Sequence, residues 1–201
     1  MPKAVIFDYG AGNLLSLRVA LEKVGLKAKI ASNGLALKNA DAIALPGVGN
    51  FSAAAEKLAP VRTDIVEAVE NGVPLLGICL GLQLFFPRSD EGVGEGLALY
   101  EGKNAWLPNS VKVPHMGWNT LRIVKQTKLL EGIKDEAYVY FVHSLYPVPT
   151  DKEVVCTETD YGTTFTSSVA SENVFGTQFH PEKSGDVGLQ ILRNFARTVK
   201  K

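Results

Sequence analysis

The segment VPLLGICLGLQLFF, residues 73–86, joins two apolar runs through a cysteine with a glycine two residues away on each side. The first run, Val73 to Ile78, has no charged residue, which is typical of a strand buried on both faces of a parallel sheet. The second run, Leu80 to Phe86, predicts a helix. A sharp turn from strand to helix needs such glycines, because the backbones approach closely there. The segment therefore predicts an α/β fold with a nucleophile, Cys79, at the turn.

Strands and helices alternate on the N-terminal side of this segment. Asn13 is expected to cap a helix from Leu14 to Val24, and residues 51–71 are expected to be helical in two pieces, split at Pro60. Short apolar and β-branched runs predict strands at Lys3–Asp8, Leu26–Ala31 and Asp41–Leu45. This alternation predicts right-handed βαβ units.

The C-terminal half has a different pattern, which favours antiparallel pairing. Strand-like pieces are short there: Asn104–Leu107, Thr120–Val124, Tyr138–His143, Val154–Thr157, Thr163–Thr166 and Val174–Phe179. A last amphipathic helix is expected from Asp186 to Val199. The fold class is thus α/β, with an open, mostly parallel central sheet flanked by helices and additional antiparallel strands in the C-terminal half. The length of 201 residues predicts one domain, residues 1–201.

The composition excludes several classes of protein. Hydrophobic residues make up 46% of the chain, which is typical of a globular protein, and 21 basic residues balance 21 acidic ones. A net charge of zero disfavours nucleic acid as a partner. Two cysteines are too few for the disulfide framework of a small secreted domain, and no apolar stretch is long enough for a signal peptide or a membrane span. We therefore expect a soluble, cytoplasmic protein with no membrane partner.

A nucleophilic cysteine needs a base, and the chain has three histidines to supply it: His115, His143 and His180. His180 is the best candidate because it ends a strand-like run and precedes Pro181-Glu182. In an extended chain His180 and Glu182 point to the same side, so the carboxylate can orient the imidazole. The simpler alternatives are a buried core cysteine at position 79 and a surface turn at residues 180–182.

Two glycine-rich turns are candidates for other roles. Pro46-Gly47-Val48-Gly49 follows a predicted strand, so the amide of Val48 or Gly49 is a candidate oxyanion-hole donor beside that of Leu80. The turn at residues 10–13 lacks both the third glycine of a dinucleotide fingerprint and the lysine of a P-loop, which excludes a nucleotide site. The histidines and cysteines lack the spacing of metal ligands, so no metal is expected, and Cys156 is interpreted as core.

The Cys79 turn and the His-x-Glu pair at residues 180–182 resemble those of the class I, or triad-type, glutamine amidotransferases, which have a flavodoxin-like fold. Within that class, the sequence looks like the glutaminase subunits of imidazole glycerol phosphate synthases, from histidine biosynthesis. The resemblance covers nearly the whole chain and is carried by these segments: Tyr9–Asn13, Pro46–Gly49, Gly77–Gln83, Pro114–Asn119, Tyr140–Ser144 and Gln178–Ser184.

The resemblance implies a role for each matching residue. Cys79 would be the nucleophile, His180 the acid and base, and Glu182 the group that orients His180. The residues implied to hold glutamine are Gly47, Gln83, His143 and Ser144. The surface implied to face a synthase partner comprises Asn13, Pro114, His115, Met116, Trp118 and Asn119. One departure is that Leu145 follows Ser144, where the family often has an aromatic residue.

The resemblance also implies a partner and a reaction. Glutamine would be hydrolysed to glutamate and ammonia without a cofactor, and a (β/α)8-barrel cyclase subunit would use the ammonia in a one-to-one heterodimer. The Gly47-Val48-Gly49 strand could rotate to complete the oxyanion hole when the barrel holds its nucleotide. The alternatives are a glutaminase of pyridoxal phosphate synthesis, a stand-alone γ-glutamyl hydrolase, and a non-catalytic binding module; residues 114–119 argue against the first two.

Overall fold

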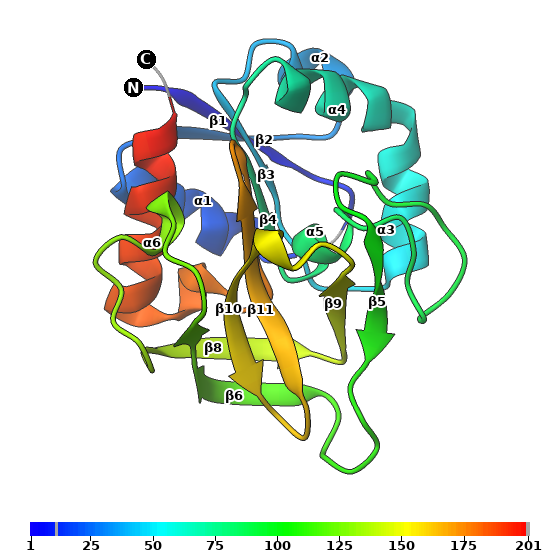
Figure 1. Cartoon of the computed structure of the whole chain (residues 1–201). Coiled ribbons are helices and arrows are strands. Elements are labelled where there is room, and N and C mark those ends of the chain that lie inside the picture. Colours follow the sequence, from blue (N-terminus) through cyan, green and yellow to red (C-terminus); the bar gives the residue numbers. More distant parts are fainter. Residues whose placement is uncertain (11, 200–201) are drawn as a thin grey trace.

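The computed structural model describes residues 1–10 and 12–199 (Figure 1). Ala11, part of the segment Tyr9–Asn13, lies outside the described residues, as do Lys200 and Lys201 at the end of the expected domain. Within the described residues the centre is an eight-stranded sheet. Its strands run in the order β2 (Lys27–Ala31), β1 (Lys3–Phe7), β3 (Ala42–Leu45), β4 (Leu75–Ile78), β12 (Val174–Thr177), β11 (Thr164–Ser171), β10 (Val155–Asp160) and β7 (Arg122–Ile123).

The direction of the strands divides this sheet into two parts. From β2 to β12 every neighbouring pair is parallel, and from β12 to β7 every pair is antiparallel. The expected α/β class, with a mostly parallel sheet and antiparallel strands added in the C-terminal half, is confirmed. Strand β12 departs from the antiparallel pattern expected for that half, because it pairs with β4 in parallel through the register Gly176↔Gly77.

Helices cover both faces of the sheet (Figure 1). Residues of β1 alternate between the faces: Ala4 and Ile6 join one apolar core, and Val5 and Phe7 join the other. The first core includes α1 (Leu14–Lys23) and α6 (Gly185–Thr198). The second includes α2 (Gly34–Leu37), α3 (Phe51–Leu58), the 3₁₀ turn η1 (Ala59–Val61) and α4 (Arg62–Glu70). The predicted division of residues 51–71 at Pro60 and the Asn13 cap of α1 are confirmed, since Asn13 Oδ1 accepts from Ser16 N.

Two further sheets of two strands each occur in the described part of the chain. Strand β6 (His115–Thr120) pairs with β8 (Tyr138–His143), and β5 (Gly102–Trp106) pairs with β9 (Leu145–Pro149). The sequence did not predict β6 or β9. The nitrogens of both prolines of β9 face away from β5. The edge that faces β5 carries the Thr150 amide and the Ser144 carbonyl, which both form hydrogen bonds there. The remaining 3₁₀ turns are η2 (Lys128–Leu130), η3 (Lys152–Val154) and η4 (Pro181–Lys183).

The parallel strands bring three loops to one edge of the central sheet. Strands β3, β4 and β12 are neighbours with the same direction, so their carboxyl ends meet. Residues 46–49 follow β3, Cys79 follows β4, and residues 178–182 follow β12. In α/β sheets this edge is where ligands bind. Among the described residues, no helix is long and apolar enough to cross a membrane.

Candidate active site

Cys79 occupies a strained turn between β4 and α5 (Leu80–Gln83). Its φ of 52° and ψ of −105° lie where side chains other than glycine are rare. The glycines on either side are required by packing. A Cβ on Gly77 would lie 2.7 Å from the Gly81 carbonyl oxygen, and one on Gly81 would lie 1.9 Å from the Leu45 carbonyl oxygen. Helix α5 is shorter than expected, because the amides of Phe85 and Phe86 bond three residues back before Pro87.

The segment after β3 lies directly against this turn. A Cβ on Gly47 would come within 2.4 Å of the Leu80 Cβ and 2.7 Å of the Gly81 nitrogen, so the two backbones touch. Gly49 has a φ of 142°, which favours glycine. Val48 and Gly49 line the same small cavity as Cys79 and Leu80. The geometry therefore brings together the backbone segments that the sequence suggested as oxyanion-hole donors.

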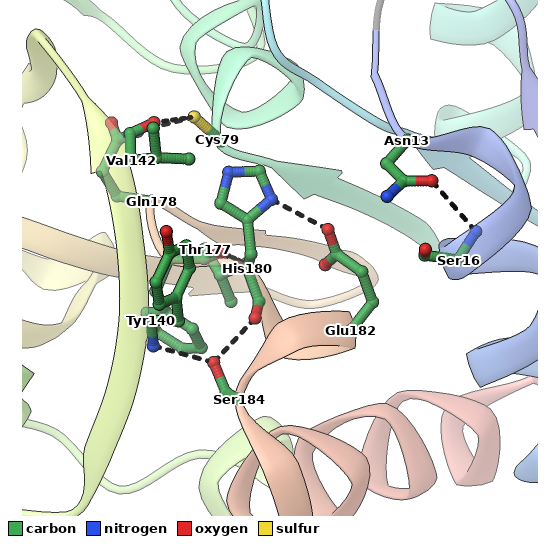
Figure 2. Close-up of polar contacts among 11 residues, drawn as sticks. Asn13, Ser16, Cys79, Tyr140, Val142, Thr177, Gln178, His180, Glu182 and Ser184 are labelled. Atoms are coloured by element: carbon green, nitrogen blue, oxygen red, sulfur yellow. Dashed lines mark hydrogen bonds and ion pairs between the residues drawn. The ribbon is translucent and has the colours of Figure 1, made fainter. Parts of the chain in front are cut away.

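His180 lies between Cys79 and Glu182 (Figure 2). Its Nδ1 is 2.8 Å from Glu182 Oε1, and both side chains are buried. Among the described residues Nε2 has no hydrogen-bond partner, which leaves it free to exchange a proton. Strand β8 fixes this loop: the His180 amide donates to the Tyr140 carbonyl, and Ser184 Oγ donates to the His180 carbonyl and accepts from the Tyr140 amide.

Charge at the site keeps His180 protonated. Burial lowers the pKa of His180, but the contacts with Cys79 and Glu182 outweigh burial and raise the pKa to about 10. At neutral pH the ring is therefore an imidazolium facing the sulfur. This is the charge state that stabilises a thiolate and that can donate a proton to a leaving group.

The sulfur of Cys79 has two polar neighbours that the sequence reasoning did not single out. The thiol lies 3.5 Å from the carbonyl oxygen of Val142, to which it can donate, and Gln178 Nε2 donates to the sulfur at 3.4 Å (Figure 2). A signal for Gln178 was present, since it lies two residues before His180 and so points to the same side of an extended chain.

A cavity of about 210 Å³ opens beside Cys79. Three of the residues that the resemblance assigned to glutamine, Gln83, His143 and Ser144, line this cavity, and Gly47 packs behind it against Leu80. Leu145 is buried and contributes its carbonyl oxygen, which accepts hydrogen bonds from Gln83 Nε2 at 3.0 Å and from His143 Nδ1 at 2.8 Å. The larger hollow beside β2, about 670 Å³, is lined by no cysteine or histidine among the described residues.

Of the residues expected on a partner-facing surface, four belong to β6 and Pro114 directly precedes it, whereas Asn13 caps α1. Met116 and Trp118 are 62% and 56% exposed, and Pro114 and Asn13 are also exposed. His115 is only 3% exposed, so its placement on that surface was wrong. Side chains alternate along a strand, and His115 therefore points inward, with the half-buried Asn119, when Met116 and Trp118 point outward. Among the described residues, no group of three or more His, Cys, Asp or Glu side chains could hold a metal ion.

Comparisons with known proteins identify the family of this chain. The family model described as Glutamine amidotransferase class-I matches residues 5–199. Three curated relatives, from Pyrococcus furiosus, Archaeoglobus fulgidus and Aquifex aeolicus, are named imidazole glycerol phosphate synthase subunit HisH. They are 49%, 50% and 47% identical to this chain, covering 98%, 98% and 99% of it and 100%, 98% and 98% of their own lengths.

Solved structures share the fold at low sequence identity. PurLQS from Thermotoga maritima matches with a TM-score of 0.78 at 21% identity, covering 99% of both chains. A putative GMP synthase subunit from Thermoplasma acidophilum matches with a TM-score of 0.75 at 19% identity, covering 99% of this chain and 94% of that one. The family match and the full-length relatives together show that this chain belongs to the class I glutamine amidotransferases, in the group named imidazole glycerol phosphate synthase subunit HisH.

Proposed function

We propose that this chain, acting as one domain over residues 1–201, is the glutaminase subunit of an imidazole glycerol phosphate synthase. The observation that carries the proposal is the geometry at Cys79: a strained turn presents the sulfur to a buried, protonated His180, which Glu182 holds at 2.8 Å. That arrangement fits attack on an amide carbonyl. The family membership and the HisH relatives supply the choice of glutamine as the amide.

The first half of the reaction forms a thioester. The Cys79 thiolate attacks the side-chain carbonyl carbon of glutamine, and the carbonyl oxygen becomes an oxyanion. The amide of Leu80 and that of Val48 or Gly49 donate hydrogen bonds to this oxygen. His180 then gives its proton to the amide nitrogen. The carbon–nitrogen bond breaks, ammonia leaves, and a γ-glutamyl thioester remains on Cys79.

The second half releases glutamate. His180, now neutral, takes a proton from a water molecule that attacks the thioester carbon. The carbon–sulfur bond breaks, and the sulfur leaves as a thiolate beside the imidazolium that has formed. Glu182 keeps Nδ1 of His180 protonated throughout, so that Nε2 is the atom that gives and takes the proton. The cycle consumes water and uses no cofactor.

The partner that would use the ammonia is a (β/α)8-barrel cyclase, and one face of the β6–β8 sheet fits such a partner. Cross-strand pairs put the following side chains on that face: Met116, Trp118, Tyr138, Tyr140 and Val142. Met116, Trp118 and Tyr138 are each more than half exposed, and the Val142 carbonyl contacts the Cys79 sulfur. Exposed apolar side chains gathered in this way mark docking surfaces. We propose a one-to-one heterodimer through this face.

Coupling between the two subunits would act through the segment Gly47-Val48-Gly49. Rotation of its peptides, permitted by the two glycines, would turn an amide towards the oxyanion when the barrel binds its nucleotide. A valine at position 49 restricts that rotation, so Gly49→Val should depress the stimulated glutaminase rate more than the basal rate. Equal loss of both rates would contradict the rotation.

The experiment that tests the function is a measurement of glutamate release from glutamine in three mixtures. They contain this chain alone, the chain with the cyclase barrel, and both with the nucleotide substrate or product of the barrel. A large rise only in the third mixture is expected. Equal, high rates in all three would retain the glutaminase but exclude the coupled synthase, leaving a stand-alone hydrolase or a glutaminase that serves another synthase.

A further inference from the structure

The Cys79 sulfur is one end of a chain of buried hydrogen bonds that begins at the partner-facing strand β6. Gln178 Nε2 donates to the sulfur at 3.4 Å, and Gln83 Nε2 donates to Gln178 Oε1 at 3.2 Å. The same Gln83 nitrogen donates to the Leu145 carbonyl at 3.0 Å. All three of these side chains, Cys79, Gln83 and Gln178, are buried.

From Leu145 the chain continues through a histidine pair. His143 Nδ1 bonds to the same Leu145 carbonyl at 2.8 Å, and His143 Nε2 lies 3.0 Å from His115 Nδ1. His115 Nε2 lies 3.4 Å from Asn119 Nδ2, which also donates to the Asp160 carbonyl. The His115 ring is stacked between Phe141 and Tyr161, with centroids at 4.8 and 3.9 Å.

Two backbone carbonyls determine the direction of every bond. Since the Leu145 carbonyl only accepts, both Gln83 Nε2 and His143 Nδ1 must donate to it. His143 Nε2 must then accept from His115 Nδ1, and His115 Nε2 must accept from Asn119. The Asp160 carbonyl independently requires a donor at Asn119 Nδ2, so the assignments from the two ends agree.

Neutral histidines are needed for this arrangement, and burial provides them. Each ring must donate from Nδ1 and accept at Nε2, which an imidazolium cannot do. Burial lowers the pKa of His143 to about 3 and that of His115 to about 4. Both rings are therefore neutral at the pH at which His180 is charged.

We propose that Gln178 is a further catalytic residue, whose side-chain amide donates a hydrogen bond to the Cys79 thiolate, and that Gln83, His143 and His115 are positioning residues that hold this amide. The hydrogen bond from Gln178 favours the thiolate form of Cys79, whereas the Val142 carbonyl, which accepts from the thiol, favours the protonated form. This proposal rests on the proposed function, because it concerns the nucleophile of that reaction. It also connects the partner-facing strand to the sulfur through the hydrogen bonds that run from Asn119 to Gln178.

The test is alkylation of Cys79 by iodoacetamide between pH 5 and 9, in the parent and in Gln178→Met. Methionine has a similar length without a donor. Because Gln178→Met loses a hydrogen bond to a charged group, its alkylation should be about tenfold slower than that of the parent at pH 6. The midpoint of its profile of alkylation rate against pH should lie at higher pH. The exposed Gln126→Met is the matched control. The other cysteine, Cys156, is fully buried, and peptide mass spectrometry assigns the adduct. Coincident profiles for the parent and Gln178→Met would overturn the proposal.

Two measurements cover the case in which Gln178→Met does not fold. In the parent, ¹⁵N spectra of labelled histidine should show His115 and His143 protonated at Nδ1 only; protonation at Nε2 of either ring would break the chain. His115→Phe keeps the stacking but loses both bonds, whereas His115→Asn keeps a donor near the Nδ1 position. Cys79 alkylation should slow in His115→Phe and recover in His115→Asn, and equal rates would contradict a positioning role. None of these readouts needs glutamine turnover, so they can fail independently of the proposed function.

Discussion

Replacing Cys79 by glycine should give a more stable protein than replacing it by alanine, which reverses the usual order of these two residues. Both variants lose the sulfur and its contacts with Val142, Gln178 and His180. They differ in the backbone, because only glycine adopts a φ of 52° with a ψ of −105° at little cost. The comparison therefore isolates the strain that β4 and α5 impose on the nucleophile.

The size of the effect follows from two opposing contributions. A residue held in a sparsely populated region of φ and ψ costs about 1–3 kcal/mol. Glycine destabilises the folded state by roughly 0.5–1 kcal/mol relative to alanine, because a glycine loses more backbone conformational entropy on folding. The balance favours glycine by about 1 kcal/mol, which corresponds to a Tm about 2–4 °C higher in a chain of this size.

The assay is urea and thermal unfolding of the two variants at pH 7, followed by circular dichroism. Ala53→Gly, at an exposed position of α3, is the control for the ordinary order and should lose about 0.5–1 kcal/mol. Neither Cys79 variant should release glutamate. If Cys79→Gly proves less stable than Cys79→Ala by the margin seen at Ala53, the turn is not strained and the reasoning fails.

Three further predictions address the rest of the site. Glu182→Gln removes the charge that holds His180 Nδ1–H, so kcat should fall by about 10²–10⁴-fold while the pKa of His180, followed by NMR, decreases. Gly47→Ala places a Cβ 2.4 Å from a neighbouring side chain and should slow glutamate release by about 10²-fold through displacement of the oxyanion segment. Burial keeps His115 and His143 neutral, so the unfolded chain binds more protons than the folded one between about pH 6.5 and 4. As the pH is lowered from about 6.5 to 4, the free energy of unfolding, measured in urea, should fall by up to about 1.4 kcal/mol per pH unit for each histidine. The fall should be less steep in His115→Phe.

The parallel half of the fold was predictable from the sequence because its signals are local. The uninterrupted apolar run at residues 73–78 and the glycines around Cys79 report burial and close packing directly. Strands β6 and β9 were not predicted. Strand β6 contains Gly117 and follows Pro114, and strand β9 contains two prolines, so both have low strand propensity. Pairing stabilises them, β6 with β8 and β9 with β5.

The candidate site was predictable as far as spacing carries information. His180 and Glu182 are two residues apart in the sequence, and the structure brings them to Cys79, although Glu182 lies in the 3₁₀ turn η4 and not in the extended segment that was expected. The contact of Gln178 with the sulfur depends on Gln83 and on the Leu145 carbonyl, 62 residues away from Gln83 in the chain, which no local pattern encodes. The burial of His115 depends on its pairing with His143 across β6 and β8, whereas the family resemblance had implied a surface role.

The central claim is that Cys79 attacks glutamine and carries its γ-glutamyl group. The most direct measurement is an acid quench of the protein during turnover with glutamine, in the presence of the cyclase barrel and its nucleotide, followed by peptide mass spectrometry. We predict a glutamyl group on the peptide that contains Cys79, and neither adduct nor glutamate from Cys79→Ala. Continued glutamate release by Cys79→Ala, or a glutamyl group on another residue, would contradict the account.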